Sequence, residues 1–124
     1  MSYRWIVIEN SLKDKSVINK YQVLSETKFA ASDPKRESRM LKVRVPETEV
    51  HSLAESLTKN IIYPYYTHFY HEDPKQNILI VVFFEKKFTL TKDDFKAAVE
   101  YGLKHGVSQK ELDISPRDIS EEDW

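Results

Sequence analysis

The strongest pattern in this chain is a pair of apolar, aromatic-rich runs within residues 61–90, joined by the polar stretch 71–77. Neither run shows the regular alternation of apolar and polar residues that marks a strand with one solvated face. The pattern therefore predicts a hairpin at the centre of a sheet, buried on both faces. Because helices elsewhere in the chain can cover one face, we expect a second subunit, a ligand or a nucleic-acid base to cover the other.

Weaker patterns place three elements before this hairpin. Residues 3–9 indicate a largely buried strand, with Trp5 on one face and Arg4 on the other. Residues 11–23 carry apolar side chains at helical spacing and predict a short helix. Residues 25–31 favour a further strand.

An alternating segment follows at residues 39–45, where apolar and basic side chains take turns. This alternation predicts a strand with one solvated face near a sheet edge, and Lys42 and Arg44 are expected on that face. The preceding residues 30–38 are polar, charged and interrupted by Pro34, so we expect a loop there.

Two amphipathic helices are predicted around the hairpin. The first opens at Pro46, which is tolerated in a first helical turn, and its apolar stripe consists of Val50, Leu53, Ala54 and Leu57. The second starts at the capping residue Thr91 and stops at Gly106. Its buried face is expected to consist of Phe95, Ala98, Val99, Gly102 and Leu103.

This order of elements predicts an α+β fold. We expect a mainly antiparallel sheet with two principal helices packed on one face. The order resembles ferredoxin-like and related α+β sandwiches, a resemblance that concerns fold and not activity. Residues 1–114 are interpreted as a single domain and residues 115–124 as an acidic C-terminal tail.

Three segments carry a second resemblance. YYTHFY at residues 65–70, ILIVVF at residues 78–83 and EYGLKHGVSQKELD at residues 100–113 resemble a small uncharacterised prokaryotic protein family. The resemblance covers the second half of the chain and implies no reaction.

Composition excludes several classes of site. The 124 residues contain no cysteine, which removes disulfides, zinc ribbons, iron–sulfur clusters and thiol nucleophiles. The chain has only two glycines and no glycine-rich phosphate loop, so we expect no cofactor. The longest uncharged apolar run, residues 78–84, is too short to span a bilayer. We therefore expect a cytoplasmic protein with no membrane partner.

The net charge of −1 conceals an asymmetry along the chain. Residues 1–45 contain ten Lys and Arg against five Asp and Glu, whereas residues 46–124 contain nine against fifteen. Such a split can indicate an anion-binding half, or two patches that attract each other. The alternative is a set of charges that only solvate the surface, since much of the acidic excess lies in the tail.

Candidate chemistry centres on the first strand of the hairpin. Tyr66, His68 and Tyr70 alternate there, so their side chains are expected on one face, and with Trp5 they are predicted to line a ligand-binding pocket. His68 is the best catalytic candidate, because an imidazole titrates near neutral pH and phenols can orient it. A structural histidine bonded to a neighbour is the commoner situation.

No metal site is expected at the hairpin. His68 and His71 are an odd number of residues apart, so on a regular strand they face opposite sides and make a poor pair of ligands. Glu72 and Asp73 precede Pro74, and we expect these carboxylates to build and solvate the turn.

The leading interpretation is a self-associating protein, most simply a homodimer. Its helix-free sheet face would be buried in the interface or would cover a small apolar or anionic ligand. One alternative is a small enzyme that uses His68 and the tyrosines. The other is a nucleic-acid-binding module through the basic residues 35–44, against which the near-neutral body and acidic tail argue.

Overall fold

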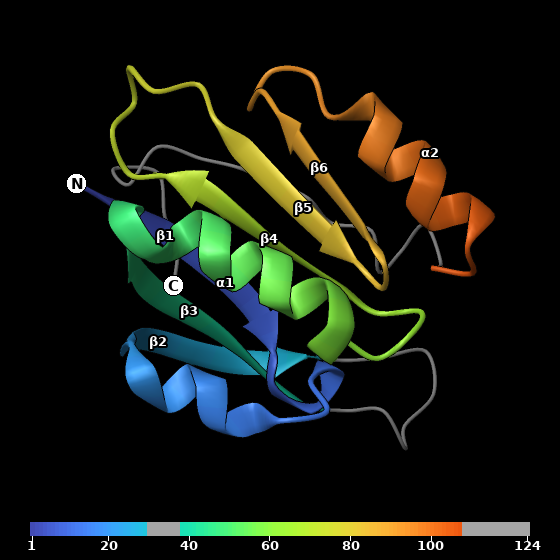
Figure 1. The fold of residues 1–124 in the computed structure, drawn as a ribbon, viewed down its shortest axis with the longest axis horizontal. Coiled ribbons are helices and arrows are strands. Elements are labelled where there is room, and N and C mark those ends of the chain that lie inside the picture. Colours follow the sequence, from blue (N-terminus) through green and yellow to red (C-terminus); the bar gives the residue numbers. More distant parts are fainter. Residues whose placement is uncertain (30–37, 108–124) are drawn as a thin grey trace.

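The computed structural model describes residues 1–29 and 38–107, which form one six-stranded antiparallel sheet with helices on it. The strand order is β2-β3-β1-β4-β5-β6 (Figure 1). The strands are β1 (Ser2–Ile8), β2 (Gln22–Phe29), β3 (Ser38–Pro46), β4 (Tyr66–His71), β5 (Leu79–Phe83) and β6 (Lys86–Leu90). The helices are the 3₁₀ turns η1 (Glu9–Ser11) and η2 (Lys15–Lys20), and α1 (Glu47–Asn60) and α2 (Lys96–Lys104). The predicted α+β class is confirmed.

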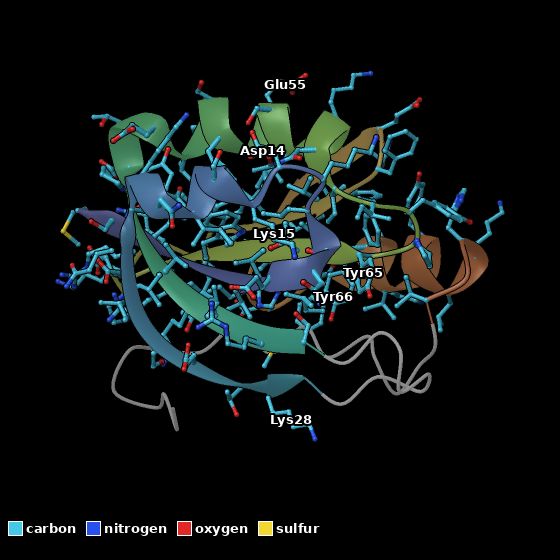
Figure 2. All side chains as sticks on the ribbon, turned by 90° about the horizontal axis from the view of Figure 1, so that it is seen from below. Asp14, Lys15, Lys28, Glu55, Tyr65 and Tyr66 are labelled. Carbon is cyan, nitrogen blue, oxygen red and sulfur yellow. The ribbon has the colours of Figure 1, made fainter. Side chains whose placement is uncertain are left out.

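α1 packs on one face of the sheet, which we call the α1 face. Its predicted stripe is buried, and η2 lies on the same side, with Ile18 in the same core (Figure 2). Glu55 on the outer side of α1 points away from the sheet. The sheet contributes Tyr3, Trp5, Val7, Leu41, Val43, Val45, Phe69, Ile80 and Val82 to this core. This is the larger of the two cores.

α2 packs on the opposite face, which we call the α2 face. There Leu79, Val81 and Phe83 of β5 form a second core with Ala98 of α2 and Val107. Side chains alternate along a strand, so Ile80 and Val82 point to α1 while their neighbours point to α2. The prediction that both helices lie on one face is therefore wrong, and a ferredoxin-like sandwich is not confirmed.

The predicted two-sided burial of the hairpin is confirmed for β5, whose five residues are all buried. β4 and β5 pair in antiparallel register, with His68 opposite Val81. The cover, however, comes from the helices of this same chain. An uncovered apolar face on β5 was the reason to expect a second subunit, and that face is covered by α2.

The local predictions before and after β2 had different outcomes. Residues 11–23 form no α-helix: they include the end of η1, the 3₁₀ turn η2 and the start of β2, and η2 is capped by the Asp14 carboxylate, which accepts the Ser16 N–H at 3.0 Å. β3 lies beside the edge strand β2, as predicted, but its expected solvated face is partly buried, since Lys42 is 2% exposed. The predicted loop, residues 30–38, lies outside the described residues except for Ser38, which begins β3, and the predicted tail, residues 115–124, lies wholly outside them.

α2 begins later than its sequence suggested. Thr91 does act as a local cap, since its hydroxyl oxygen accepts the N–H of Asp94 at 3.1 Å, but this closes a separate turn and the helix starts at Lys96. Leu103, near the C-terminal end of this helix, is exposed, so its predicted burial is wrong. Gly106 follows the helix with φ +90°, as expected for a residue that ends it.

The covering of both faces of β5 is testable by truncating one side chain on each face. Leu79→Ala and Ile80→Ala should each lower the free energy of unfolding by about 2–5 kcal/mol, because each leaves a cavity under a helix. Urea unfolding followed by circular dichroism measures the effect. Val23→Ala, at an exposed position on β2, should change it by less than about 0.5 kcal/mol. A Leu79→Ala effect no larger than this control would show that α2 does not cover β5.

Candidate functional site

Three rings form a ladder along β4 on the α2 face. The ring centroids of Tyr66 and His68 are 6.3 Å apart at an interplanar angle of 20°, and those of His68 and Tyr70 are 6.4 Å apart at 25°. Their alternation in the sequence predicted this shared face. His68 and Tyr70 are buried and Tyr66 is half-buried.

Trp5 lies on the opposite face from these rings. Its indole stacks on Phe69 at a centroid distance of 5.6 Å, and its Nε1–H donates to the Thr67 hydroxyl at 2.8 Å. Both partners belong to the α1 face because they alternate with the ladder residues. The prediction that Trp5 lines a pocket with Tyr66, His68 and Tyr70 is therefore wrong.

Basic side chains lie beside the ladder on the two neighbouring strands. In register, Tyr70 of β4 is opposite Arg4 of β1, and Arg4 is opposite Arg44 of β3. One step along, His68 is opposite Ile6, which is opposite Lys42. Neighbouring strands are about 4.8 Å apart, so three cationic groups lie within two strands of the aromatic ladder. We call Arg4, Lys42 and Arg44 the basic row.

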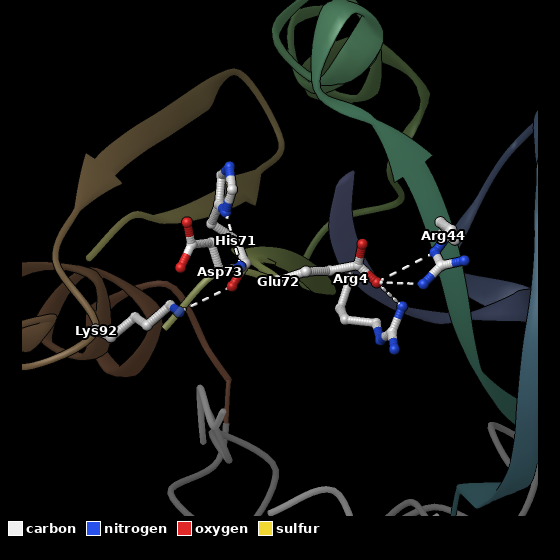
Figure 3. A network of polar contacts seen from close by, with 6 residues as sticks. All are labelled: Arg4, Arg44, His71, Glu72, Asp73 and Lys92. Carbon is white, nitrogen blue, oxygen red and sulfur yellow. Dashed lines mark hydrogen bonds and ion pairs between the residues drawn. The ribbon is translucent and has the colours of Figure 1, made fainter. Parts of the chain in front are cut away.

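Glu72 holds two members of the basic row together (Figure 3). Its Oε2 accepts hydrogen bonds from Arg4 Nη1 and from Arg44, whose Nε and Nη2 lie 3.1 and 3.0 Å away. The Glu72 N–H donates to the carbonyl oxygen of Ser2 at 3.0 Å, which fixes the residue beside β1. The prediction that Glu72 only solvates the turn is wrong, since its side chain is buried against Arg4.

The members of the basic row differ in exposure. Lys42 is 2% exposed and Arg4 is 7% exposed, whereas the Arg44 side chain is 44% exposed. Arg44 is therefore the member of the basic row that a group from outside the sheet can reach.

His71 belongs to a separate cluster on the α1 face. Its Nδ1 accepts the N–H of Asp73 at 3.0 Å, so its Nε2 carries the proton and donates to the Glu47 carboxylate at 2.7 Å. The Tyr3 ring meets it edge-on at 4.7 Å, and burial followed by the charge of Glu47 raises the pKa of Tyr3. Lys92 Nζ donates to the His71 carbonyl oxygen at 2.8 Å (Figure 3). His71 therefore connects β4 to β1 through Tyr3 and to α1 through Glu47.

The basic residues near 35–44 do not make one surface. Arg39 has the same parity as the core residues Leu41 and Val43 and pairs with Glu26 at 2.5 Å and with Glu9. Lys42 and Arg44 have the other parity and lie on the α2 face. Arg39 therefore lies on the opposite face from Lys42 and Arg44, residues 35–37 lie outside the described residues, and nucleic-acid binding through residues 35–44 stays a prediction.

Sequence reasoning missed the partnership of Arg4 with Glu72. The two residues are 68 positions apart, and no local spacing links them. One signal was present: a charged Arg4 within an otherwise apolar strand requires a buried partner if that strand is central.

Searches for metal ligands and membrane spans were negative. Across residues 1–29 and 38–107, no group of three or more side chains has the composition and proximity of a metal site. Over the same part of the chain, no helix is long and apolar enough to cross a bilayer.

Comparison with known proteins gave no match to a family model, to a curated protein or to a solved structure. The resemblance to a small prokaryotic family stays a prediction from the sequence.

The role of Glu72 can be measured by removing its charge. Glu72→Gln should lower the free energy of unfolding by about 3 kcal/mol, because Arg4 is left buried without its carboxylate. The control Glu55→Gln removes an exposed ion pair with Lys87 and should cost less than about 1 kcal/mol. Chemical denaturation of the two variants gives the comparison, and equal losses would contradict a buried Arg4–Glu72 pair.

Proposed function

We propose that this protein is a binding module for a small anionic ligand that carries a flat ring. The observation that supports this proposal is the register of β3, β1 and β4, which sets the basic row beside the aromatic ladder on one face of the sheet. A ring of the ligand would stack on the half-buried Tyr66, and its anionic group would bind Arg44, whose side chain is 44% exposed.

The binding energies expected from the aromatic ladder and from the basic row favour a ligand that has both a flat ring and an anionic group. Stacking of a base on an aromatic side chain contributes about 1–3 kcal/mol, and a charge-assisted hydrogen bond contributes about 1.5–3 kcal/mol. The half-buried Tyr66 and the half-exposed Arg44 are the members of the two groups that a ligand reaches first. The aromatic ladder alone would orient the ring of a ligand without neutralising its charge, and the basic row alone would neutralise the charge without orienting the ring.

Ligand binding is better supported than the dimer or enzyme interpretations. The dimer was inferred from an apolar face of β5 without cover, and α2 covers that face. The ring of His68 is stacked between two tyrosines, which is the arrangement that the ligand-binding proposal uses. We therefore assign His68 to the stacking ladder in this proposal.

A set of four related compounds tests the requirement for both features. Adenosine 5′-monophosphate carries ring and anion, adenosine the ring alone, ribose 5-phosphate an anion without the ring, and inorganic phosphate the anion alone. Isothermal titration calorimetry should show the monophosphate binding at least about tenfold more tightly than the other three, since one such interaction is worth more than 1.4 kcal/mol. Equal affinity for adenosine and its monophosphate, or no binding of any compound, would refute the proposal.

Variants on the two faces of β3 locate the binding. Arg44→Met should weaken monophosphate binding about tenfold because it removes one charge-assisted contact. Arg39→Met makes a similar change on the same strand but on the α1 face, so it should leave the affinity unchanged. Tyr66→Ala, at a half-buried position, removes the stacking surface and provides the second test if Arg44→Met loses its native circular dichroism spectrum. Equal effects of the Arg39 and Arg44 changes would place any binding elsewhere.

A further inference from the structure

β2 and β6 are the two edge strands of the sheet within the described residues (Figure 1). The outer side of an edge strand presents backbone N–H and C=O groups with which another strand can pair. β6 has five residues, which include two lysines and no carboxylate, and lysine at an edge opposes such pairing. β2 has eight residues and carries one charge of each sign. β2 is therefore the edge that is better suited to pairing.

The C-terminal part of β2 is regular and exposed. Its pairing with β3 has a shift near the start of the strand and is regular over residues 25–29. Glu26, Thr27 and Lys28 are exposed. Glu26 and Lys28 are two residues apart, so they share one face of the strand, and Lys28 points away from β3 in Figure 2. This part of β2 thus carries an acid and a base on either side of Thr27.

This order of charges matches an antiparallel copy of itself. In a two-fold pairing of β2 with β2 of a second copy, centred on Thr27, Glu26 of each copy stands opposite Lys28 of the other. The two Thr27 side chains also face each other, and cross-strand threonine pairs and pairs of opposite charge both stabilise a sheet. Moving the centre by one residue would set Glu26 against Glu26 or Lys28 against Lys28, which is unfavourable. The charges therefore select one register among the symmetric pairings.

The neighbouring strand strengthens this preference. Lys28 is opposite Arg39 of β3 in register, and like charges in opposite positions destabilise a strand pair. Within one copy, Glu26 forms an exposed ion pair with Arg39 at 2.5 Å, which brings a carboxylate to these cations. Glu26 of a second copy would place another carboxylate on the outer side of Lys28. The association therefore adds negative charge where two cations lie side by side.

We propose that two copies of this protein associate edge to edge through β2, in an antiparallel pairing centred on Thr27. The two sheets then form one continuous sheet. The regular segment is short, so the interface is small and the expected dissociation constant is about 0.1–1 mM. This dimer uses the edge of the sheet and not its face, and it does not depend on the proposed ligand binding.

Charge reversal on β2 tests this pairing by sedimentation velocity at increasing protein concentration. Glu26→Lys sets lysine against lysine, and Lys28→Glu sets glutamate against glutamate, each at two positions related by the two-fold axis. Each variant should raise the dissociation constant at least about tenfold, because two favourable pairs become repulsive. The matched control Glu100→Lys reverses an exposed charge on α2 and should leave the association unchanged.

An equimolar mixture of the two β2 variants provides the decisive comparison. In the mixed pair, the strand of Glu26→Lys carries two positive charges and the strand of Lys28→Glu two negative charges, so both contacts are attractive again. The mixture should associate at least as tightly as the native protein, although neither variant alone does. A native protein that stays monomeric at about 1 mM, or a mixture that associates no more tightly than the separate variants, would overturn the proposal.

Amide hydrogen exchange in the native chain locates the contact without any substitution. Raising the protein concentration should increase protection within residues 25–29 and leave β6, the other described edge, unchanged. The increase should be smaller at about 1 M salt, where charges are screened beyond about 3 Å. Protection that rises at β6 and not at β2, or at neither edge, would contradict the association through β2.

Discussion

The alternation of side chains along the three central strands is the constraint on which this structure depends. In β1, β3 and β4, one parity carries apolar residues that pack under α1, and the other carries charged and aromatic residues. A shift of one residue in any pairing would place Arg4 or Lys42 in the main core. The cost of burying those charges there therefore helps to fix the register, and the same register assembles the candidate site.

Fold and site are coupled through Glu72. Its carboxylate joins Arg4 of β1 to Arg44 of β3 from the end of β4, so one side chain links three strands. A buried ion pair of this kind contributes less to net stability than to the choice of one arrangement, because desolvation offsets much of the attraction. In this protein it also holds the half-exposed Arg44 beside β1.

The two helices act differently on the sheet. α1 covers the broad core under the central strands, whereas α2 covers β5 and its neighbour β6 on the other face. This division accounts for the apolar character of β5 on both sides without a partner subunit. It also separates the α2 face into an apolar part under α2 and a polar part over β1 and β3, where charge governs what can bind.

The sequence by itself determined the elements whose pattern is set by local periodicity. The stripe from Val50 to Leu57 and the shared face of Tyr66, His68 and Tyr70 follow directly from helix and strand geometry. The tertiary structure decided what local spacing cannot encode: the face on which α2 packs, the position of Trp5 behind the ladder, and the pairing of Arg4 with Glu72. Strand order and crossovers set these relations, since they bring together residues that are far apart in the chain. They also decide which of the two sets of alternating side chains on a strand faces each helix.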